Sequence, residues 1–160
     1  MRPLPICKLL PSWANRVPSQ VIDVTNKKLT PETEKQLWTA AETVAGLAYA
    51  PYSDFHVGAA LLTSEGEIVT GCNVENASYG LTNCAERTAI FRAIAEGKLS
   101  HGVSIDAIAV VHRDHQSCTP CGACRQVLYE FGPNAVVLYE FDGARRQTSI
   151  SALLPESFQL

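Results

Sequence analysis

The sequence contains no run of more than two basic residues and no long uninterrupted apolar segment. Its 160 residues carry a formal net charge of -3, and the arginine doublet Arg145–Arg146 is interpreted as solvated surface. Proteins that follow a nucleic-acid backbone usually have a basic face, so we expect no nucleic-acid partner. A membrane-spanning helix needs about 20 apolar residues, so we expect no membrane partner either.

The N-terminal region also lacks the apolar stretch of a secretion signal, because Pro3, Pro5, Lys8 and Pro11 interrupt it. Six cysteines without such a signal favour free thiols or metal ligands in a reducing compartment over disulfides. We therefore expect a cytoplasmic protein. Residues 1–29 are interpreted as an irregular N-terminal extension, to which the sequence assigns no role.

The length is sufficient for one domain with a substantial core, which we place at residues 30–160. The first helix is predicted to begin at Thr30, a favourable N-cap followed by proline, and to continue until Pro51. Further on, the apolar pattern predicts strands at 55–62, 68–73, 105–111, 135–139 and 148–150, and helices at 84–95 and 121–131. This order of elements predicts an α/β fold with one mixed sheet and helices on both faces.

Three cysteines have the spacing of metal ligands. Cys121 and Cys124 are three residues apart at a predicted helix start, so they share a face, and Cys84 stands at the start of another helix. Zinc takes thiolates in tetrahedral geometry, and helix N-termini stabilise thiolates. We therefore predict one Zn²⁺ per chain at these cysteines. Arg87 and Arg125 are close enough in sequence to offset the thiolate charge by hydrogen bonding to sulfur.

Two other uses of the cysteines stay open from their spacing. The Cys-x-x-Cys pair could be a redox pair, or Cys118 could complete a closed structural zinc site, because Cys118 and Cys121 have the same spacing as that pair. Pro120 favours the catalytic interpretation, because a proline directly before Cys121 starts the helix that presents both cysteines of the pair. Cys7 and Cys72 are predicted to be uncoordinated.

Glu86 is the predicted general acid and base. Residues two apart on a regular helix point to opposite sides, so Glu86 and Cys84 reach one site only if Cys84 lies at the helix tip. Glu86 would then take a proton from water and pass protons to the ring nitrogen and the leaving amine of an amidine-like ring. The plainer interpretation is a carboxylate near a helix dipole. Cys-x-Glu followed by Pro-Cys-x-x-Cys is the pattern of zinc-dependent deaminases, which favours catalysis.

The likeness extends beyond the zinc pattern, to the segments AYAPYSDFHVGAALL, GCNVENASYGLTNCAERTAI and PCGACRQVL. Together these segments resemble the small homotetrameric cytidine deaminases, from about Leu47 to Phe131, with a further similarity at Leu153–Leu154–Pro155. The resemblance implies a three-layer α/β/α sandwich with a five-stranded mixed sheet, a small-molecule nucleoside substrate and a homotetramer. It also implies that Phe158 reaches into the site of a neighbouring subunit. The long, proline-rich start before Thr30 departs from the family.

The resemblance assigns roles to further residues. Phe55 would stack on the pyrimidine ring, and Asn73 and Glu75 would hold the ribose hydroxyls. Residues two apart on an extended segment face the same way, which fits the second role independently. Ala85 would offer backbone groups to the base, and Tyr79 would lie in the loop that leads to the site. The plainer alternative makes Phe55 a core residue and the two polar residues part of a turn.

Three functions remain in view. The first is hydrolytic deamination of cytidine and deoxycytidine to uridine and deoxyuridine, with release of ammonia, as in pyrimidine salvage. The second is deamination of a cytosine-bearing antibiotic by a blasticidin-type relative, which shares the Cys-Ala-Glu and Pro-Cys-Gly-x-Cys-Arg-Gln segments. The pair Asn73 and Glu75 favours the nucleoside. The third is a non-catalytic zinc-stabilised binding module, and Glu86 argues against it.

Overall fold

The computed structural model describes residues 29–158, and helix α1 (Pro31–Ala45) is its first element. Thr30 is the N-cap, since its side chain accepts a hydrogen bond from the backbone N–H of Thr33 at 3.1 Å. Pro31 occupies the first helical position, where its missing N–H costs nothing. The predicted start of this helix is confirmed.

The predicted end of the helix is wrong, because α1 stops at Ala45 and not at Pro51. Beyond the helix, Tyr49 forms a short parallel bridge with Val74. The backbone N–H of Tyr49 donates to the carbonyl of Asn73 at 3.1 Å, which helical geometry would not allow. Tertiary pairing therefore overrides the helical spacing of the apolar residues here.

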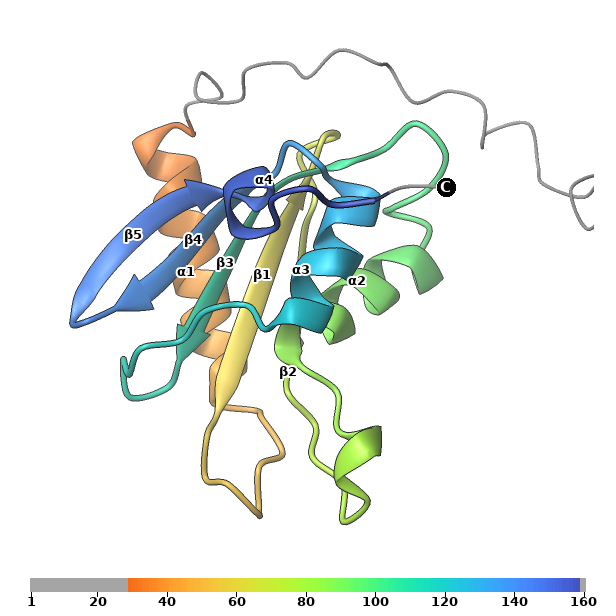
Figure 1. The fold of residues 1–160 in the computed structure, drawn as a ribbon. Helices are drawn as coiled ribbons and strands as arrows, with labels where there is room; N and C mark the ends of the chain where they lie inside the picture. The colour runs from red at the N-terminus through yellow and green to blue at the C-terminus, as the bar shows by residue number, and fades with distance from the viewer. Residues whose placement is uncertain (1–28, 159–160) are drawn as a thin grey trace, which may run out of the picture.

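The sheet has five strands in the order β2-β1-β3-β4-β5 (Figure 1). The strands are β1 (Val57–Thr63), β2 (Ile68–Cys72), β3 (Ile105–His112), β4 (Val136–Phe141) and β5 (Ala144–Ser149). β3 and β4 are parallel, and the other three neighbouring pairs are antiparallel. The predicted five-stranded mixed sheet is confirmed.

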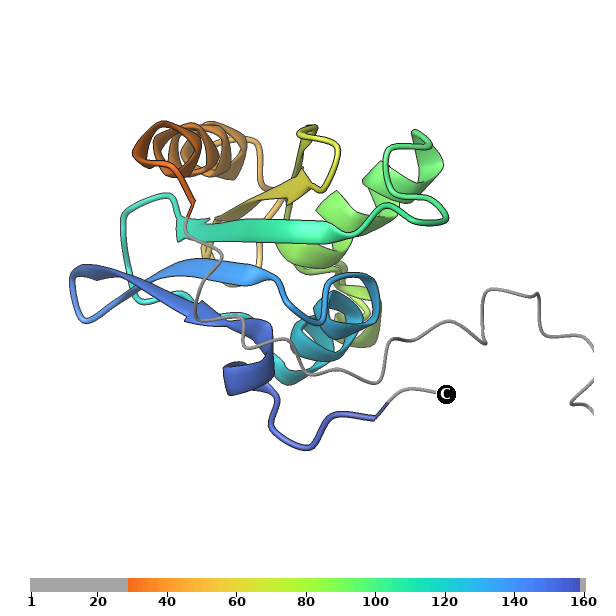
Figure 2. The ribbon, with the colours of Figure 1, turned by 90° about the horizontal axis from the view of Figure 1, so that it is seen from above.

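Helices cover both faces of the sheet, which gives the predicted three layers (Figure 2). Helix α1 packs on one face over a core that includes Leu37, Trp38 and Leu138. On the other face, α2 (Ala85–Ala95) and α3 (Gly122–Phe131) share a second core that includes Ile90 and Leu128. The predicted zinc ligands lie at the starts of α2 and α3. Because these two helices share one face of the sheet, the ligands lie on the same side of it.

Gly71 allows α2 to lie directly on the backbone of β2. A Cβ atom at this position would be 2.3 Å from the backbone nitrogen of Ala89 and 2.7 Å from the carbonyl oxygen of Ala85. Neither backbone atom can move independently of the helix, so any side chain at Gly71 would push α2 off the sheet. This contact fixes the position of the helix that carries Cys84 and Glu86.

The end of the domain differs from the prediction. Residues 148 and 149 of the predicted strand at 148–150 are the end of a longer strand, β5. The prediction is wrong at Ile150, which begins a short helix, α4 (Ile150–Leu153), that the apolar pattern does not predict. Most β5 side chains are exposed, so the strand has no apolar alternation to reveal it. Its register is set by the turn at Asp142 and Gly143, both of which have positive φ angles.

Of the predicted N-terminal extension, only Leu29 lies within the described residues, where it packs against the core beneath α1. The rest of the extension, including Cys7, lies outside them, and the boundary at residue 30 stays a prediction. Within residues 29–158, none of the helices combines the length and the apolar character that a membrane crossing requires.

Candidate active site

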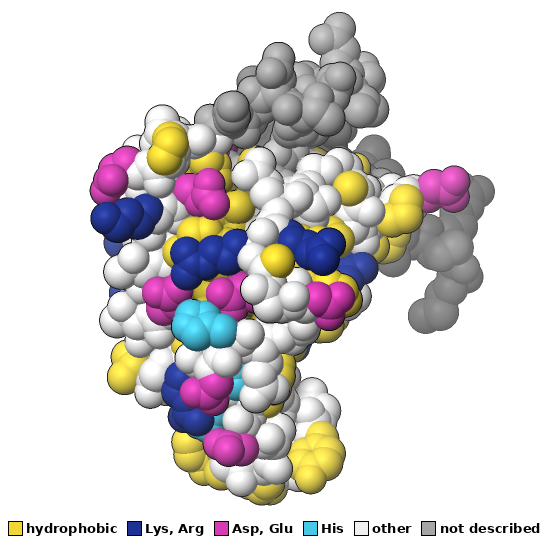
Figure 3. Space-filling model, turned by 90° about the vertical axis from the view of Figure 1, so that its left-hand side faces the viewer, with side chains coloured by type: hydrophobic (Ala, Val, Ile, Leu, Met, Phe, Trp, Pro, Cys, Tyr) yellow, Lys and Arg dark blue, Asp and Glu magenta, His cyan; other side chains and the backbone are white. Residues whose placement is uncertain are grey.

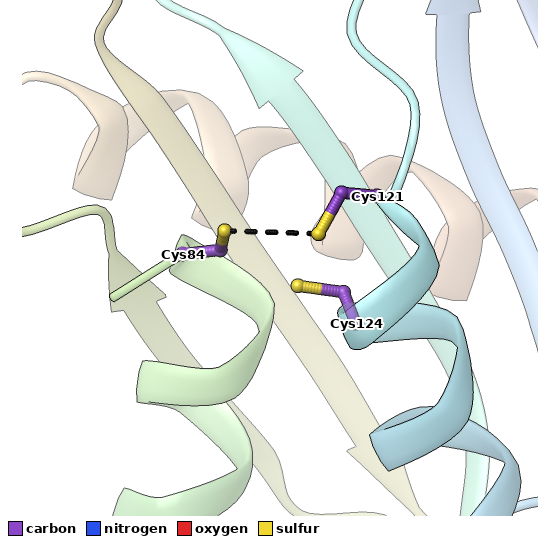
Figure 4. Close-up of side chains that lie close together, drawn as sticks. All are labelled: Cys84, Cys121 and Cys124. Carbon is purple, nitrogen blue, oxygen red and sulfur yellow. Dashed lines mark hydrogen bonds between the residues drawn. The ribbon is translucent and has the colours of Figure 1, made fainter. Parts of the chain in front are cut away.

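The three predicted zinc ligands come together from the N-terminal ends of two helices (Figure 4). Cys84 is the N-cap of α2, Cys121 is the N-cap of α3, and Cys124 follows in α3. The three sulfur atoms lie within 4.8 Å of one another, and those of Cys84 and Cys121 are 4.0 Å apart. Tetrahedral bonds of about 2.3 Å place thiolate sulfurs roughly 3.8 Å apart, so these donors fit a zinc ion.

The surroundings of Cys84 favour its thiolate. Hydrogen bonds from the Cys124 thiol and from Arg87 lower the pKa of Cys84 to about 5. The same contact with Cys84, together with burial, raises the pKa of Cys124. Arg87 Nη2 lies 3.3 Å from Cys84 Sγ, in the position predicted for it. Zinc binds the thiolate form, so a deprotonated sulfur beside a fixed cation suits a metal ligand.

Arg125 does not lie as predicted. Its Nε donates to the carbonyl of Pro120 at 2.7 Å, and its Nη1 donates to the carbonyl of Leu153 at 3.0 Å. Pro120 precedes α3 and Leu153 ends α4, so both carbonyls lie at helix ends, where backbone groups need side-chain partners. Arg125 therefore connects the approach to Cys121 with α4, and the predicted hydrogen bond to sulfur is replaced by bonds to backbone oxygens.

The other two described cysteines lie apart from the three-thiol group. Cys118 is buried in the core shared by α2 and α3, and burial raises the pKa of its thiol to about 12. Its sulfur is not among the three that lie within 4.8 Å of one another. Cys72 is half-buried and its Sγ donates to the carbonyl of Leu47 at 3.6 Å. Both positions support the prediction that neither cysteine binds zinc.

Glu86 lies in the first turn of α2, with Cys84 at the helix tip as its predicted role requires. The residue is only 4% exposed, and this burial raises the pKa of the carboxyl to about 7. The negative charge of Cys84 acts in the same direction. A carboxyl group with a pKa near neutrality can both take up and release a proton at physiological pH. A carboxylate that only stabilised the helix dipole would not need to be buried beside the thiols. The burial of Glu86 therefore favours the catalytic interpretation.

A pocket of about 340 Å³ is lined by Tyr52, Ser53, Glu75, Tyr79 and Thr82. The carboxylate of Glu75 accepts hydrogen bonds from the Ser53 hydroxyl and from the backbone N–H groups of Tyr52 and Ser53. These bonds lower the pKa of Glu75, so it remains ionised at neutral pH. The pocket therefore presents a fixed hydrogen-bond acceptor to a ligand.

Asn73 and Phe55 lie together beside this pocket-lining segment. The amide of Asn73 accepts from the N–H of Val57 and donates to the carbonyl of Phe55, both at 2.8 Å. Asn73 and Glu75 thus bond to the same 52–57 segment, which agrees with their facing the same way. The ring of Phe55 packs against the buried ring of His112, with centroids 4.3 Å apart.

The remaining predicted contacts occupy two environments. Ala85, which lies between Cys84 and Glu86 in the sequence, is fully buried, whereas Tyr79 and Phe158 are exposed. The rings of Tyr79 and Tyr52 pack edge to face with their centroids 6.0 Å apart, and both residues line the pocket. Tyr52 and Ser53 lie between the predicted helix, which was expected to continue until Pro51, and the predicted strand at 55–62, and nothing in the sequence predicted that they line the pocket. The proline and small polar residues of this segment indicate a turn, and they do not reveal what the turn faces.

Comparison with known proteins identifies the family. A sequence description of the cytidine and deoxycytidylate deaminase zinc-binding region matches residues 31–140, which is more than half of the chain. The chain belongs to this family. It is 50% identical over 113 residues to a cytidine deaminase of Halalkalibacterium halodurans, covering 69% of this chain and 83% of the relative.

Solved structures of family members are similar to this fold. The crystal structure of a cytidine deaminase from Burkholderia pseudomallei is similar to this fold with a TM-score of 0.71 and 50% identity. The match covers 81% of this chain and all of that one. A blasticidin-S deaminase of Bacillus cereus is more distant, with 34% identity over 107 residues, which cover 62% of this chain and 74% of the relative.

Proposed function

We propose that this family member is a zinc-dependent deaminase of cytidine and deoxycytidine, which releases ammonia and forms uridine and deoxyuridine. The observation that carries the proposal is the buried carboxyl of Glu86, with a pKa of about 7, two residues from Cys84 in the three-thiol group. The relatives named cytidine deaminase support the choice of substrate. This reaction belongs to pyrimidine salvage, for which we propose a cytoplasmic location and a small-molecule partner.

The reaction replaces an amino group on the pyrimidine ring with oxygen from water. Cys84, Cys121 and Cys124 would hold a zinc ion, which would supply a Lewis acid that lowers the pKa of water. Glu86 takes up the two protons that the attacking water gives up in turn, and it delivers one to the ring nitrogen N3 and the other to the departing amine, which leaves as ammonia. Its burial keeps bulk water away from these transfers, and its near-neutral pKa suits both uptake and release.

The substrate is oriented by residues from outside the thiol group. Phe55 offers its ring to the pyrimidine, and the half-buried carboxylate of Glu75 accepts from a ribose hydroxyl in the pocket. Asn73 completes the sugar site with the amide hydrogen that is not committed to the Phe55 carbonyl. Ala85, at the start of α2, contributes backbone groups to the base.

The sugar site also separates the two deaminase candidates. A cytosine-bearing antibiotic without a ribose would not supply the sugar hydroxyl that Glu75 is proposed to bind, and a binding site built for a hydroxyl discriminates strongly against a ligand that lacks it. The greater identity to cytidine deaminases points the same way. A non-catalytic zinc module gives no reason to bury Glu86 beside the thiols.

The direct test is to incubate the zinc-loaded protein with cytidine, deoxycytidine and blasticidin S in parallel. Deamination is followed by the loss of ultraviolet absorbance of the cytosine ring and by the ammonia released, with zinc quantified in the same sample. We expect turnover of both nucleosides and one zinc per chain. Faster turnover of the antibiotic, or a zinc-loaded protein without any turnover, would contradict the proposal.

Glu75→Gln is expected to raise the KM for cytidine about tenfold or more, with a smaller change in kcat. The amide still accepts from the backbone of Tyr52 and Ser53, so the loop stays in place, but the charged acceptor for the sugar is lost. Glu65→Gln, in the exposed turn between β1 and β2, is the matched control. If wild-type protein deaminates 3′-deoxycytidine as efficiently as cytidine, the ribose assignment is wrong.

The assembly that we propose is a homotetramer in which neighbouring chains close each site. Large apolar side chains are exposed on the segments around the pocket, among them Leu47 (75%), Tyr79 (75%) and Leu81 (72%). Phe158, near the end of the described chain, is 67% exposed. Apolar surface of this kind marks association sites, and a shared interface would cover it.

Light scattering is expected to give about four times the chain mass of 17.3 kDa. Deleting residues 156–160 should raise the KM for cytidine and leave the zinc content unchanged, because the Phe158 ring would be lost from the neighbouring site while the thiols stay. A fully active species of single-chain mass would refute the shared site.

A further inference from the structure

Glu140 is a buried carboxylate that the proposed reaction does not use. It lies near the end of β4, and only 6% of the residue is exposed. Val136 and Leu138, at alternate positions before it on the strand, belong to the core beneath α1, so Glu140 points to the α1 side of the sheet. A carboxylate buried in this way requires charged or hydrogen-bonding partners.

The first partners come from the segment that leads to the zinc site, residues 113–121. His115 Nδ1 donates to the carboxylate of Glu140, at 3.0 Å from Oε1 and 3.2 Å from Oε2. The backbone of Glu140 binds the same segment again, because the N–H of Cys118 donates to its carbonyl at 2.9 Å. The segment is therefore attached to β4 before it reaches Cys121 at the start of α3 (Figure 1).

Arg145 on β5 holds the Glu140 carboxylate from the other side. Its Nε lies 3.6 Å from Glu140 Oε1, while its Nη2 donates to Glu42 on α1. The guanidinium also lies 4.5 Å from the centre of the Trp38 ring. Figure 3 shows basic, acidic and histidine side chains gathered on this face. Because α1 fixes Arg145, the carboxylate that His115 reaches has a fixed position.

The conformation of His115 indicates that this contact holds the segment in place. Its φ angle is 55°, in the left-handed region that residues other than glycine adopt rarely and at a cost. The hydrogen bonds to Glu140 offset that cost. Without them, the backbone at His115 would gain by returning to a common conformation, and the segment would move.

We propose that Glu140 is a positioning residue for the zinc site: by anchoring His115, it holds Cys121 within reach of the other two thiols and slows the loss of zinc. Cys121 is the exposed member of the three, whereas Cys124 is buried. A chelator reaches the exposed ligand first, so the anchor of its segment controls release. The inference rests on the proposed zinc site and not on the identity of the substrate.

The test measures zinc release from the full-length, zinc-loaded protein into an excess of a chromogenic chelator. Glu140→Gln and His115→Asn are each expected to speed release about ten- to a hundredfold, the effect of losing one hydrogen bond to a charged group. The double variant should release zinc no faster than the faster single variant, because both changes remove the same bond. Glu65→Gln, in the exposed turn between β1 and β2, is the control, since it removes a carboxylate that belongs neither to this cluster nor to residues 113–121.

Unfolding rates in urea, measured on the same variants, separate positioning from general stability. If the release rate changes only in proportion to the unfolding rate, or if Glu65→Gln speeds release as much as Glu140→Gln, the proposal is wrong. His115→Asn keeps the test decisive should Glu140→Gln fail to fold, because the His115 side chain is 57% exposed. An unchanged release rate in His115→Asn overturns the proposal. A zinc-loaded protein that does not deaminate cytidine would refute the proposed function while leaving this test intact.

Discussion

Glu86→Gln is expected to retain its fold and its zinc, while its kcat for cytidine falls by about a hundredfold to ten-thousandfold. This is the contribution that a positioned general acid and base makes to the rate. Glutamine has nearly the same shape, so α2 and its contact with β2 at Gly71 stay unchanged. The amide cannot carry the proton between water, the ring nitrogen and the leaving amine. The measurement compares kcat and KM for cytidine with the zinc content and the thermal midpoint of the same preparation.

Glu96→Gln is the control for this substitution, because it changes a glutamate at the exposed C-terminal end of the same helix. It should leave kcat unchanged. If the Glu86→Gln protein binds one zinc per chain and keeps a tenth of the wild-type kcat, Glu86 is not the general acid and base. The buried carboxyl would then serve the structure of the site.

The second large effect is expected from the thiols. Replacing Cys84, Cys121 or Cys124 by alanine should abolish stoichiometric zinc binding and all turnover. Structural zinc sites with four ligands bind with about 10 to 16 kcal/mol, so one ligand corresponds to roughly 3 kcal/mol, or about a hundredfold or more in affinity. Zinc per chain after dialysis, measured by atomic absorption, checks this, and the thermal midpoint should fall because metal binding is coupled to folding.

The matched controls are Cys72→Ser and Cys118→Ser. Both should keep one zinc per chain, because both thiols lie apart from the three-thiol group. Cys118→Ser should lower stability by about 1 to 3 kcal/mol if the buried hydroxyl lacks a partner, without changing the metal content. Loss of zinc from Cys118→Ser to the same extent as from Cys124→Ala would overturn the ligand assignment.

Much of this fold follows from local sequence signals. The Thr30–Pro31 helix start and the apolar runs of β1 and β3 predict the elements that form the core. Prediction was wrong where tertiary contacts decide the structure. The pairing of Tyr49 with Val74 ends α1 early, and β5 forms by pairing with β4 although its own side chains are mostly exposed.

The site shows the same division. The spacing of the three cysteines and Glu86 was sufficient to predict a cluster, because two helix tips can place these groups in few ways. Side-chain direction was less predictable. Arg87 and Arg125 each follow a predicted ligand closely in sequence, yet Arg87 bonds to sulfur and Arg125 bonds to two backbone carbonyls. Glu140 gave no sequence signal, since its partner His115 is 25 residues away.

The outermost strand, β5, has a consequence for how the protein behaves when concentrated. Among the described strands it pairs only with β4, so its other edge presents unpaired backbone groups that could template growth of a sheet from one molecule to the next. Arg145 and Arg146 project from this strand and are exposed. Repeated positive charge along an edge opposes the stacking of identical strands. We therefore expect the charge on this edge, above all that of Arg146, to disfavour fibrous aggregation, whereas Arg145 is also paired with Glu42 and Glu140.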